Sequence, residues 1–365
     1  MASDTPVGQG PERPRVAFLG PVASYSHQAT KATFPETDWE LTPTGTIKEI
    51  FDVVQSGEVA YGVAPFENSS HGPVMFTLDC LADRRGAYGS IHVCGEIYLD
   101  VHHFLLGRRG QPAGAGAGAD DDPALLSPGT STPTPSQPDP QRPRARPLSD
   151  LRHVRRVYSH PQAFGQTGAF LSTYLRGVDA VDVSSTSRAA ELAARDESGA
   201  SAAIAGEIAA EANGLDVLAR CIEDHENNTT RFFVVQRGVG PGPSLPDKLT
   251  CGDETAGGRG PEAPEAGGSE VQQPPRYRSL VSFTVPTRSP GALADVLDCF
   301  RRFQLDLTSI NSLPSLIQPF QYLFFVEFEG SKLADPDGRV NGALEDVAKV
   351  AHSWRWLGSW SNQRK

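Results

Sequence analysis

Apolar residues in the first third of the chain occur in short runs separated by polar turns. The runs at 15–20 and 59–66 have the length of buried strands, and the second is apolar enough for the inside of a parallel sheet. Between them, apolar residues at helical spacing over 46–55 predict an amphipathic helix. A helix over 74–81 and an extended segment over 91–106 follow. This region is therefore predicted to alternate strands with helices.

The same alternation resumes after residue 153. Strands are expected at 154–158, 178–183 and 201–205, with a helix from Pro161 to Tyr174 and others after 185–187 and over 206–213. The polar segment 227–231 then leads into a β-branched and aromatic strand. Strands alternating with helices indicate an α/β layer architecture around a mostly parallel sheet.

The last part of the chain has a different element order. Strand patterns at 280–285, 305–310, 321–328 and 354–360 alternate with two helical patterns, the first capped by 289–291. The resulting β-α-β-β-α-β order is ferredoxin-like. Because a fold does not fix a function, a regulatory domain is at this point one option among several.

Composition divides the chain. Gly, Pro and charged residues dominate 107–148 and 238–276, which have too little apolar surface to offset their ordering entropy. We expect a disordered N-terminus (1–14), an α/β domain (15–237) with a low-complexity insertion (107–148), a linker (238–276) and a C-terminal module (277–362).

Charge and cysteine usage exclude several classes of protein. A net charge of −11 argues against nucleic acid or an anionic membrane as the main partner, and no apolar run has membrane-spanning length. The five cysteines are widely spaced, with no Cys-x-x-Cys pair or Cys/His cluster, so neither a disulfide framework nor a zinc site is predicted. The first residues lack the apolar core of a secretory signal. A cytoplasmic location is expected.

Four polar segments fall where predicted strands end: 23–28, 67–72, 159–166 and 227–231. Open α/β folds bind ligands at strand ends, so these segments are candidates for a single pocket. The last combines two amides, two hydroxyls and a guanidinium, which can bind a small anion, and a positioned hydroxyl can also move a proton. The alternative is that each segment is an ordinary polar turn or helix cap.

In order and spacing, these segments resemble the prephenate dehydratase family. The resemblance covers roughly 15–236, and the region 278–360 resembles the ACT domain that these enzymes carry. The catalytic part resembles the family at Gly20-Pro-Val-Ala-Ser-Tyr-Ser-His-Gln-Ala29, Glu67-Asn-Ser-Ser-His-Gly72, Tyr158-Ser-His-Pro-Gln-Ala163 and Asn228-Thr-Thr-Arg-Phe232, and the ACT-like part at Ser289-Pro-Gly-Ala-Leu293 and Asn311-Ser-Leu-Pro314.

The resemblance implies two α/β subdomains around a cleft, similar to periplasmic-binding-protein folds, followed by a ferredoxin-like ACT domain. The implied reaction converts prephenate to phenylpyruvate, water and carbon dioxide in phenylalanine biosynthesis. No metal or organic cofactor is implied. L-Phenylalanine is the implied effector, bound between paired ACT domains of a homodimer or homotetramer.

By the same resemblance, Thr230 is the catalytic residue and donates a proton to the leaving hydroxyl. Asn68, Ser69, Ser159 and Gln166 are implied to bind substrate. Arg231 is a further substrate-binding candidate, for which a structural pair with Glu67 is the alternative. His27 and His160 could serve as acids, with helix-capping or core roles as the alternative. Strand alternation directs Thr229 away from Thr230.

The implied effector loops contain Gly291, Ala292, Leu293, Asn311, Ser312, Leu313 and Pro314. The family pattern has an acidic residue where this chain has Asn311 and an arginine where it has Leu313. Because a carboxylate and a guanidinium are lost, we hypothesise reduced or altered feedback by phenylalanine.

Two other interpretations stay open at this point. An arogenate dehydratase would perform the same chemistry on the amino-bearing substrate, and only a comparison of kcat/KM on both substrates separates the two. A non-catalytic amino-acid sensor could keep the cleft and the ACT-like region. The presence of Thr230 beside Arg231, together with Ser159 and Gln166, argues against a sensor, which would be free to lose the proton donor.

Overall fold

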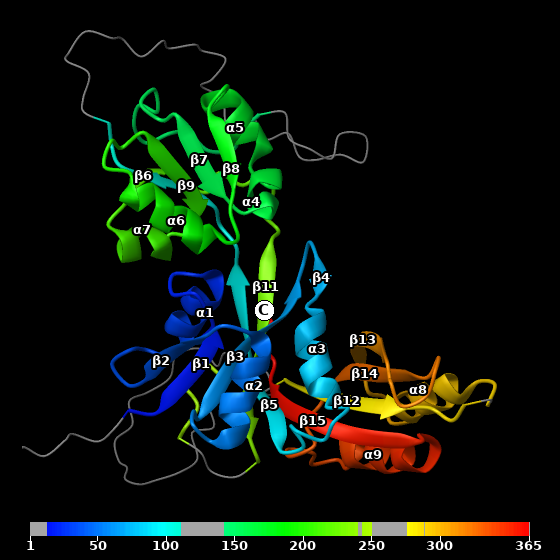
Figure 1. The fold of residues 1–365 in the computed structure, drawn as a ribbon. Helices are drawn as coiled ribbons and strands as arrows, with labels where there is room; N and C mark the ends of the chain where they lie inside the picture. The colour runs from blue at the N-terminus through cyan, green and yellow to red at the C-terminus, as the bar shows by residue number, and fades with distance from the viewer. Residues whose placement is uncertain (1–12, 111–141, 240–242, 250–275, 288, 365) are drawn as a thin grey trace, which may run out of the picture.

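The computed structural model describes residues 13–110, 142–239, 243–249, 276–287 and 289–364. Figure 1 shows two α/β lobes, one above the other, with the C-terminal module beside the lower lobe. The predicted disorder of 1–14, the centre of the predicted insertion and most of the predicted linker lie outside the described residues. The mixed α/β class with two lobes is confirmed.

The first lobe is built on a mixed sheet in the order β5-β11-β3-β1-β2. Strand β1 runs parallel to β2 and β3, whereas β11 is antiparallel to both β3 and β5. The prediction of a mostly parallel sheet is therefore wrong for the centre of this lobe, because β11 returns from the other lobe. Its elements are β1 (Arg15–Leu19), α1 (Tyr25–Thr33), β2 (Glu40–Thr44), α2 (Ile47–Ser56), β3 (Tyr61–Asn68), β4 (Gly72–Pro73), α3 (Met75–Ala82), β5 (Ile91–Asp100) and β11 (Thr229–Arg237).

The second lobe carries a five-stranded sheet in the order β10-β6-β9-β7-β8. The chain enters this lobe through 101–103 and leaves it through 220–228, and these two crossover segments join the lobes. One of its apolar clusters is rich in alanine and includes Ala23 of the first lobe. The elements are β6 (Phe104–Gly107), β7 (Arg156–Ser159), α4 (Pro161–Gly165), α5 (Gly168–Tyr174), β8 (Asp179–Asp182), α6 (Thr186–Arg195), β9 (Ser201–Ala205), α7 (Ile208–Asn213) and β10 (Asp216–Ala219).

The C-terminal module has the predicted β-α-β-β-α-β order and an antiparallel sheet in the order β13-β14-β12-β15. The expected loop Asn311–Pro314 lies instead on β13, because these residues pair with Tyr322–Phe325 of β14. Leu313 is buried there. The elements are β12 (Tyr277–Thr284), α8 (Ala292–Arg302), β13 (Leu307–Pro314), β14 (Tyr322–Glu329), α9 (Arg339–Val350) and β15 (Ser353–Ser361).

The open face of the module's sheet packs directly on the first lobe. Phe325 and Trp360 of the module share one apolar core with Phe66 and Phe233 of the lobe, and the rings of Phe233 and Trp360 lie 5.2 Å apart. Strand β15 also joins β5 through Gly358, so the two sheets form one continuous sheet. The module is therefore an integral layer of the structure.

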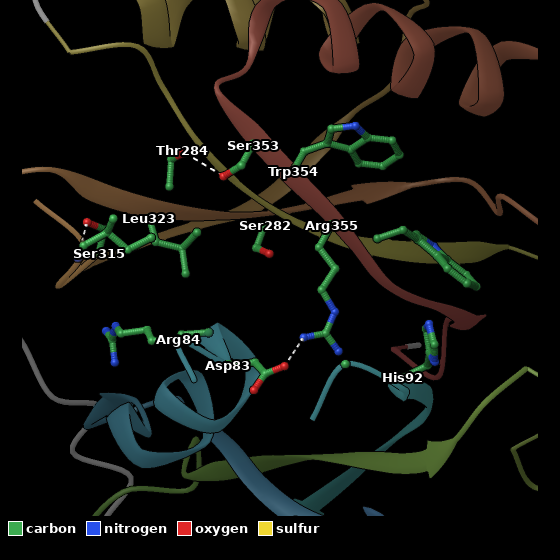
Figure 2. A pocket seen from close by; sticks show the side chains of 14 residues that line it. Asp83, Arg84, His92, Ser282, Thr284, Ser315, Leu323, Ser353, Trp354 and Arg355 are labelled. Atoms are coloured by element: carbon green, nitrogen blue, oxygen red, sulfur yellow. Dashed lines mark hydrogen bonds and ion pairs between the residues drawn. The ribbon is translucent and has the colours of Figure 1, made fainter. Parts of the chain in front are cut away.

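A pocket of about 350 Å³ remains at this junction, and Figure 2 shows that residues of both parts line it. Arg355 of β15 donates to the carbonyl oxygens of Tyr88 (2.7 Å) and Ile91 (2.9 Å) and pairs with Asp83. From the opposite wall, Arg84 donates to a carbonyl oxygen of β13. Both guanidinium groups are thus engaged in holding the two parts together.

Parts of the segments predicted as insertion and linker are packed. Leu148 donates its backbone N–H to Leu218, and Leu245 and Leu249 pack on the core of the first lobe. Composition alone missed these short apolar stretches. Within the described residues, no helix combines the length and apolar character needed to cross a bilayer. The cysteines at 80, 94, 221 and 299 are free.

We predict that Gly358→Ala lowers the free energy of unfolding by about 3 kcal/mol or more, measured by urea denaturation. Gly358 has φ 144°, and an added Cβ would lie 2.0 Å from the Val93 carbonyl oxygen, so β15 and β5 would have to separate. Gly89→Ala is the control, because its Cβ would meet open space. Equal unfolding midpoints for the two variants would contradict the prediction.

Candidate active site

Three of the predicted site residues, Asn68, Gln166 and Thr230, lie in one hydrogen-bonded cluster. Asn68 ends β3 and Thr230 begins β11, and the antiparallel register places them opposite one another. Asn68 Nδ2 donates to Thr230 Oγ1 at 3.0 Å. The register of the central sheet thus brings together two residues that are 162 positions apart in the chain.

The orientation of the Asn68 amide is fixed by the turn that follows β3. Its Oδ1 accepts the backbone N–H groups of Ser70 (3.0 Å) and His71 (3.1 Å), so Nδ2 must face Thr230. Thr230 therefore accepts a hydrogen bond through its oxygen, and among the described residues none accepts the Thr230 proton. A hydroxyl polarised in this way is a better donor, because hydrogen bonds in a chain strengthen one another.

Asn228 and His103 complete the cluster. Asn228 accepts from Asn68 Nδ2 at 2.7 Å and donates to Gln166 Oε1 at 3.2 Å. His103 Nε2 lies 2.7 Å from the same Gln166 oxygen. Two neighbours thus hold the Gln166 oxygen, and among the described residues none accepts from its NH₂ group.

Sequence reasoning missed His103, which lies inside the long apolar run of 91–106. Its side chain is buried, and its Nδ1 lies 2.8 Å from the hydroxyl of Tyr25. Burial lowers the pKa of His103 and so favours the neutral ring, and the tautomer with its proton on Nε2 donates to Gln166 Oε1. The only sequence signal was a histidine pair at the end of a strand pattern.

A break in a helix positions Gln166. The helix predicted from 161 to 174 is two helices, α4 and α5, with Gln166 as the C-cap of the first. The Thr167 hydroxyl donates to the Ala163 carbonyl oxygen, and the Asp224 carboxylate accepts the first two N–H groups of α5. The chain therefore turns at Gln166, which leaves the α4 axis to reach His103 and Asn228.

The other predicted site residues lie outside this cluster. Ser159 is fully buried and donates to the Ile204 carbonyl oxygen, within the sheet of the second lobe. Ser69 donates to the Asn227 carbonyl oxygen and thus joins the two loops that flank the cluster. Arg231 points to the opposite face of β11, where it is buried against Glu96. This geometry therefore does not indicate that Ser159 or Arg231 contacts the substrate directly.

Thr229 and the two candidate histidines follow the alternatives given for them. Thr229 bonds Asp100 on the exposed side. His27 accepts the N–H of Ala23 and stacks on Phe18, and His160 caps α4 by accepting the N–H of Gln162. The core role is thus confirmed for His27 and the helix-capping role for His160.

Three potential metal ligands lie close together in the crossover segments. Their spacing in the sequence did not reveal this group. Donor atoms of His102, Cys221 and Glu223 lie within 4.8 Å of one another. The two Glu223 oxygens already bind His102 Nδ1 (2.8 Å) and the N–H of His103 (2.9 Å). Glu223 thus has a role without a metal, since it holds the segment that carries His103.

Comparison with known proteins identifies the family. The family model for prephenate dehydratase matches residues 16–239. This chain belongs to the prephenate dehydratase family. The bifunctional chorismate mutase/prephenate dehydratase of Neisseria gonorrhoeae is 30% identical to it over 350 residues, which cover 96% of this chain and 75% of that protein.

Solved structures agree on the fold of this prephenate dehydratase family member. The prephenate dehydratase of Arthrobacter aurescens in complex with L-Phe matches at TM-score 0.67 and 24% identity, over 96% of this chain and 90% of that one. The quorum-quenching acylase GqqA matches at TM-score 0.64 and 24% identity, over 94% and 96%. At this identity the likeness shows the fold alone.

We predict that His103→Gln weakens the pH dependence of stability between pH 5 and 7.5, measured from urea unfolding midpoints. In the unfolded dehydratase the histidine pKa is about 6.5, and burial depresses it in the folded state. The stability linked to His103 is therefore fully present above about pH 6.5 and is lost as pH falls from there toward the lower folded pKa.

His352→Gln, at an exposed position, should keep the dependence of the unmodified protein. A His103→Gln variant with an unchanged dependence would show that this ring does not resist protonation in the folded state.

Proposed function

We propose that this chain is a prephenate dehydratase in which Thr230 protonates the hydroxyl that leaves the prephenate ring. The family match supports the activity. The role of Thr230 rests on one observation, the hydrogen bond from Asn68 Nδ2 to Thr230 Oγ1. The orientation of the Asn68 amide is fixed because its Oδ1 accepts two backbone N–H groups.

The reaction needs help mainly at the departing oxygen. As the bond from the ring to its carboxylate breaks, the electron pair enters the ring, the C–O bond breaks, and the ring becomes aromatic. Protonation of the leaving oxygen gives water, and general-acid help of this kind contributes typically 10²–10⁴-fold. Thr230 is a weak acid, so the Asn68 bond is needed to stabilise the negative charge that develops on its oxygen, and a solvent proton restores the hydroxyl.

Neutral donors suit a substrate that must lose one of its carboxylates. A guanidinium at the ring carboxylate would stabilise the ground state more than the transition state, which raises the barrier. The Gln166 NH₂ group and the amide of Asn228 bind an anion more weakly. In this proposal Gln166 and Asn68 orient the substrate, while His103 and Asn228 orient Gln166.

We further propose that 15–237 forms a catalytic domain of the periplasmic-binding-protein type and that 277–362 is an ACT domain, with 238–276 as linker. The ferredoxin-like strand order of the module supports this division. An effector site between paired modules would require a homodimer or homotetramer. L-Phenylalanine is the proposed effector, and the complex of the A. aurescens dehydratase with L-Phe supports this choice.

The activity is tested by incubating the protein with prephenate and following phenylpyruvate by its ultraviolet absorbance in base, with arogenate in parallel. We expect Thr230→Ala to lower kcat by about 10²–10⁴-fold with little change in KM, because it removes the proton donor. Thr230→Ser should retain part of the turnover. Thr229→Ala is the matched control, since Thr229 bonds Asp100 on the exposed side.

Turnover of Thr230→Ala within a few-fold of the unmodified protein would contradict the role of Thr230. Exclusive turnover of arogenate would replace prephenate as the substrate.

We predict weak feedback by phenylalanine. The position of the family's arginine holds Leu313, whose side chain is buried in the core that joins the module to the first lobe, and Asn311 carries no charge. Neither of these two positions therefore offers a carboxylate or a guanidinium to the amino acid. The measurement is dehydratase activity against phenylalanine concentration, and strong inhibition at micromolar levels would contradict the prediction.

A further inference from the structure

A buried cluster of four charges lies where the C-terminal module meets the catalytic domain. Arg231 and Glu96 come from the catalytic domain, and Arg278 and Glu327 come from the module. Each exposes 5% of its surface or less. With two positive and two negative groups the cluster is balanced, so the loss of any one member leaves a buried charge without its counterpart.

Within this charge cluster each part has an ion pair of its own, and the Arg231–Glu327 pair joins the two parts. Arg231 Nη2 lies 2.6 Å from Glu96 Oε2 and 2.8 Å from Glu327 Oε2, and Arg278 Nη1 lies 3.1 Å from Glu327 Oε1. Thr308 of the module also donates to Glu327, at 2.8 Å. Burial lowers the pKa of Arg231, but the carboxylates of Glu327 and Glu96 outweigh it, so the guanidinium stays charged.

The charge cluster lies one residue from the proposed proton donor, on the other side of the sheet. Arg231 follows Thr230 on β11 and is paired with Glu67, which precedes Asn68 on β3. Arg231 Nη1 also lies 3.9 Å from Glu67 Oε2. The register between these strands shifts directly after Arg231. The charge cluster therefore lies at the two residue pairs of β11 and β3 that precede this register shift, Arg231 with Glu67 and Thr230 with Asn68. The second pair forms the Asn68–Thr230 hydrogen bond.

We propose that Glu327 and Arg278 of the C-terminal module are positioning residues for the dehydratase reaction. They fix the Arg231 side chain, and through its backbone they fix the distance between Thr230 and Asn68. This inference rests on the proposed role of Thr230. It makes the module part of the catalytic apparatus. A ligand that displaces β14 would change the position of Thr230 through Glu327 and Arg231.

The test uses Glu327→Gln in the full-length protein. The variant keeps the shape of the side chain but leaves one positive charge uncompensated, so Arg231 should shift. We expect kcat for prephenate to fall by about tenfold to a hundredfold with KM within twofold, because a displacement of about 1 Å costs on that order. Glu345→Gln, at an exposed position of α9, is the control for the loss of one carboxylate from the module and should keep kcat.

A second variant separates positioning from stability. Adding Arg278→Met to Glu327→Gln removes one charge of each sign and leaves Arg231 paired with Glu96 inside the cluster and with Glu67 beside it. We expect this double variant to regain at least about fivefold in kcat over the single variant, since the charge balance is restored. A role in stability alone would change the folded fraction, measured by circular dichroism, and leave kcat per folded molecule unchanged.

Should Glu327→Gln fail to fold, Glu327→Asp keeps the charge and shortens the reach by one methylene, and we expect it to fold with a severalfold lower kcat. Wild-type kcat in the folded Gln or Asp variant, or no recovery in the double variant, would overturn the inference. If the unmodified protein turns over neither prephenate nor arogenate, the proposed function is overturned instead, so the two failures are distinguishable.

Discussion

The antiparallel placement of β11 between β3 and β5 is the constraint on which the rest of this structure depends. This strand leaves the second lobe, enters the centre of the first, and is hydrogen-bonded on both edges. A strand in this position cannot slip by one residue without turning every side chain to the other face. The register of β11 therefore decides which of its side chains face the proposed site and which face the module.

The two faces of β11 carry opposite kinds of chemistry. Thr230 meets neutral amides on one face, whereas Arg231 meets carboxylates on the other. Charges that are buried among apolar groups interact strongly and hold a fixed geometry, provided that each has a partner. In the proposed function, the neutral groups then act on an anionic substrate while the buried charges stay on the other face of the strand. The buried charges on one face of β11 thus fix the geometry of the strand, and the neutral amides on the other face are left for the proposed substrate.

The crossover segments connect the second lobe to this arrangement. Glu223 holds the backbone at His103, and Asn228 and His103 hold Gln166. The proposed site therefore contains hydrogen bonds that cross from one lobe to the other. A change in the angle between the lobes would alter the position of Gln166 relative to Thr230, so lobe geometry and catalysis are coupled in this proposal.

The sequence by itself determined most of the elements, although not β2 or β10, together with the ferredoxin-like order of the module and the resemblance at the strand-end motifs. These depend on local periodicity and on short motifs, both of which are readable along the chain.

Tertiary structure alone decided that β11 runs antiparallel, that the helix breaks at Gln166, that His103 joins Gln166, and that Arg231 faces Glu96 and Glu327. Each of these pairings joins residues far apart in the chain, and their partners are chosen by sheet register and by the exclusion of water from buried charges. No local pattern encodes either of these.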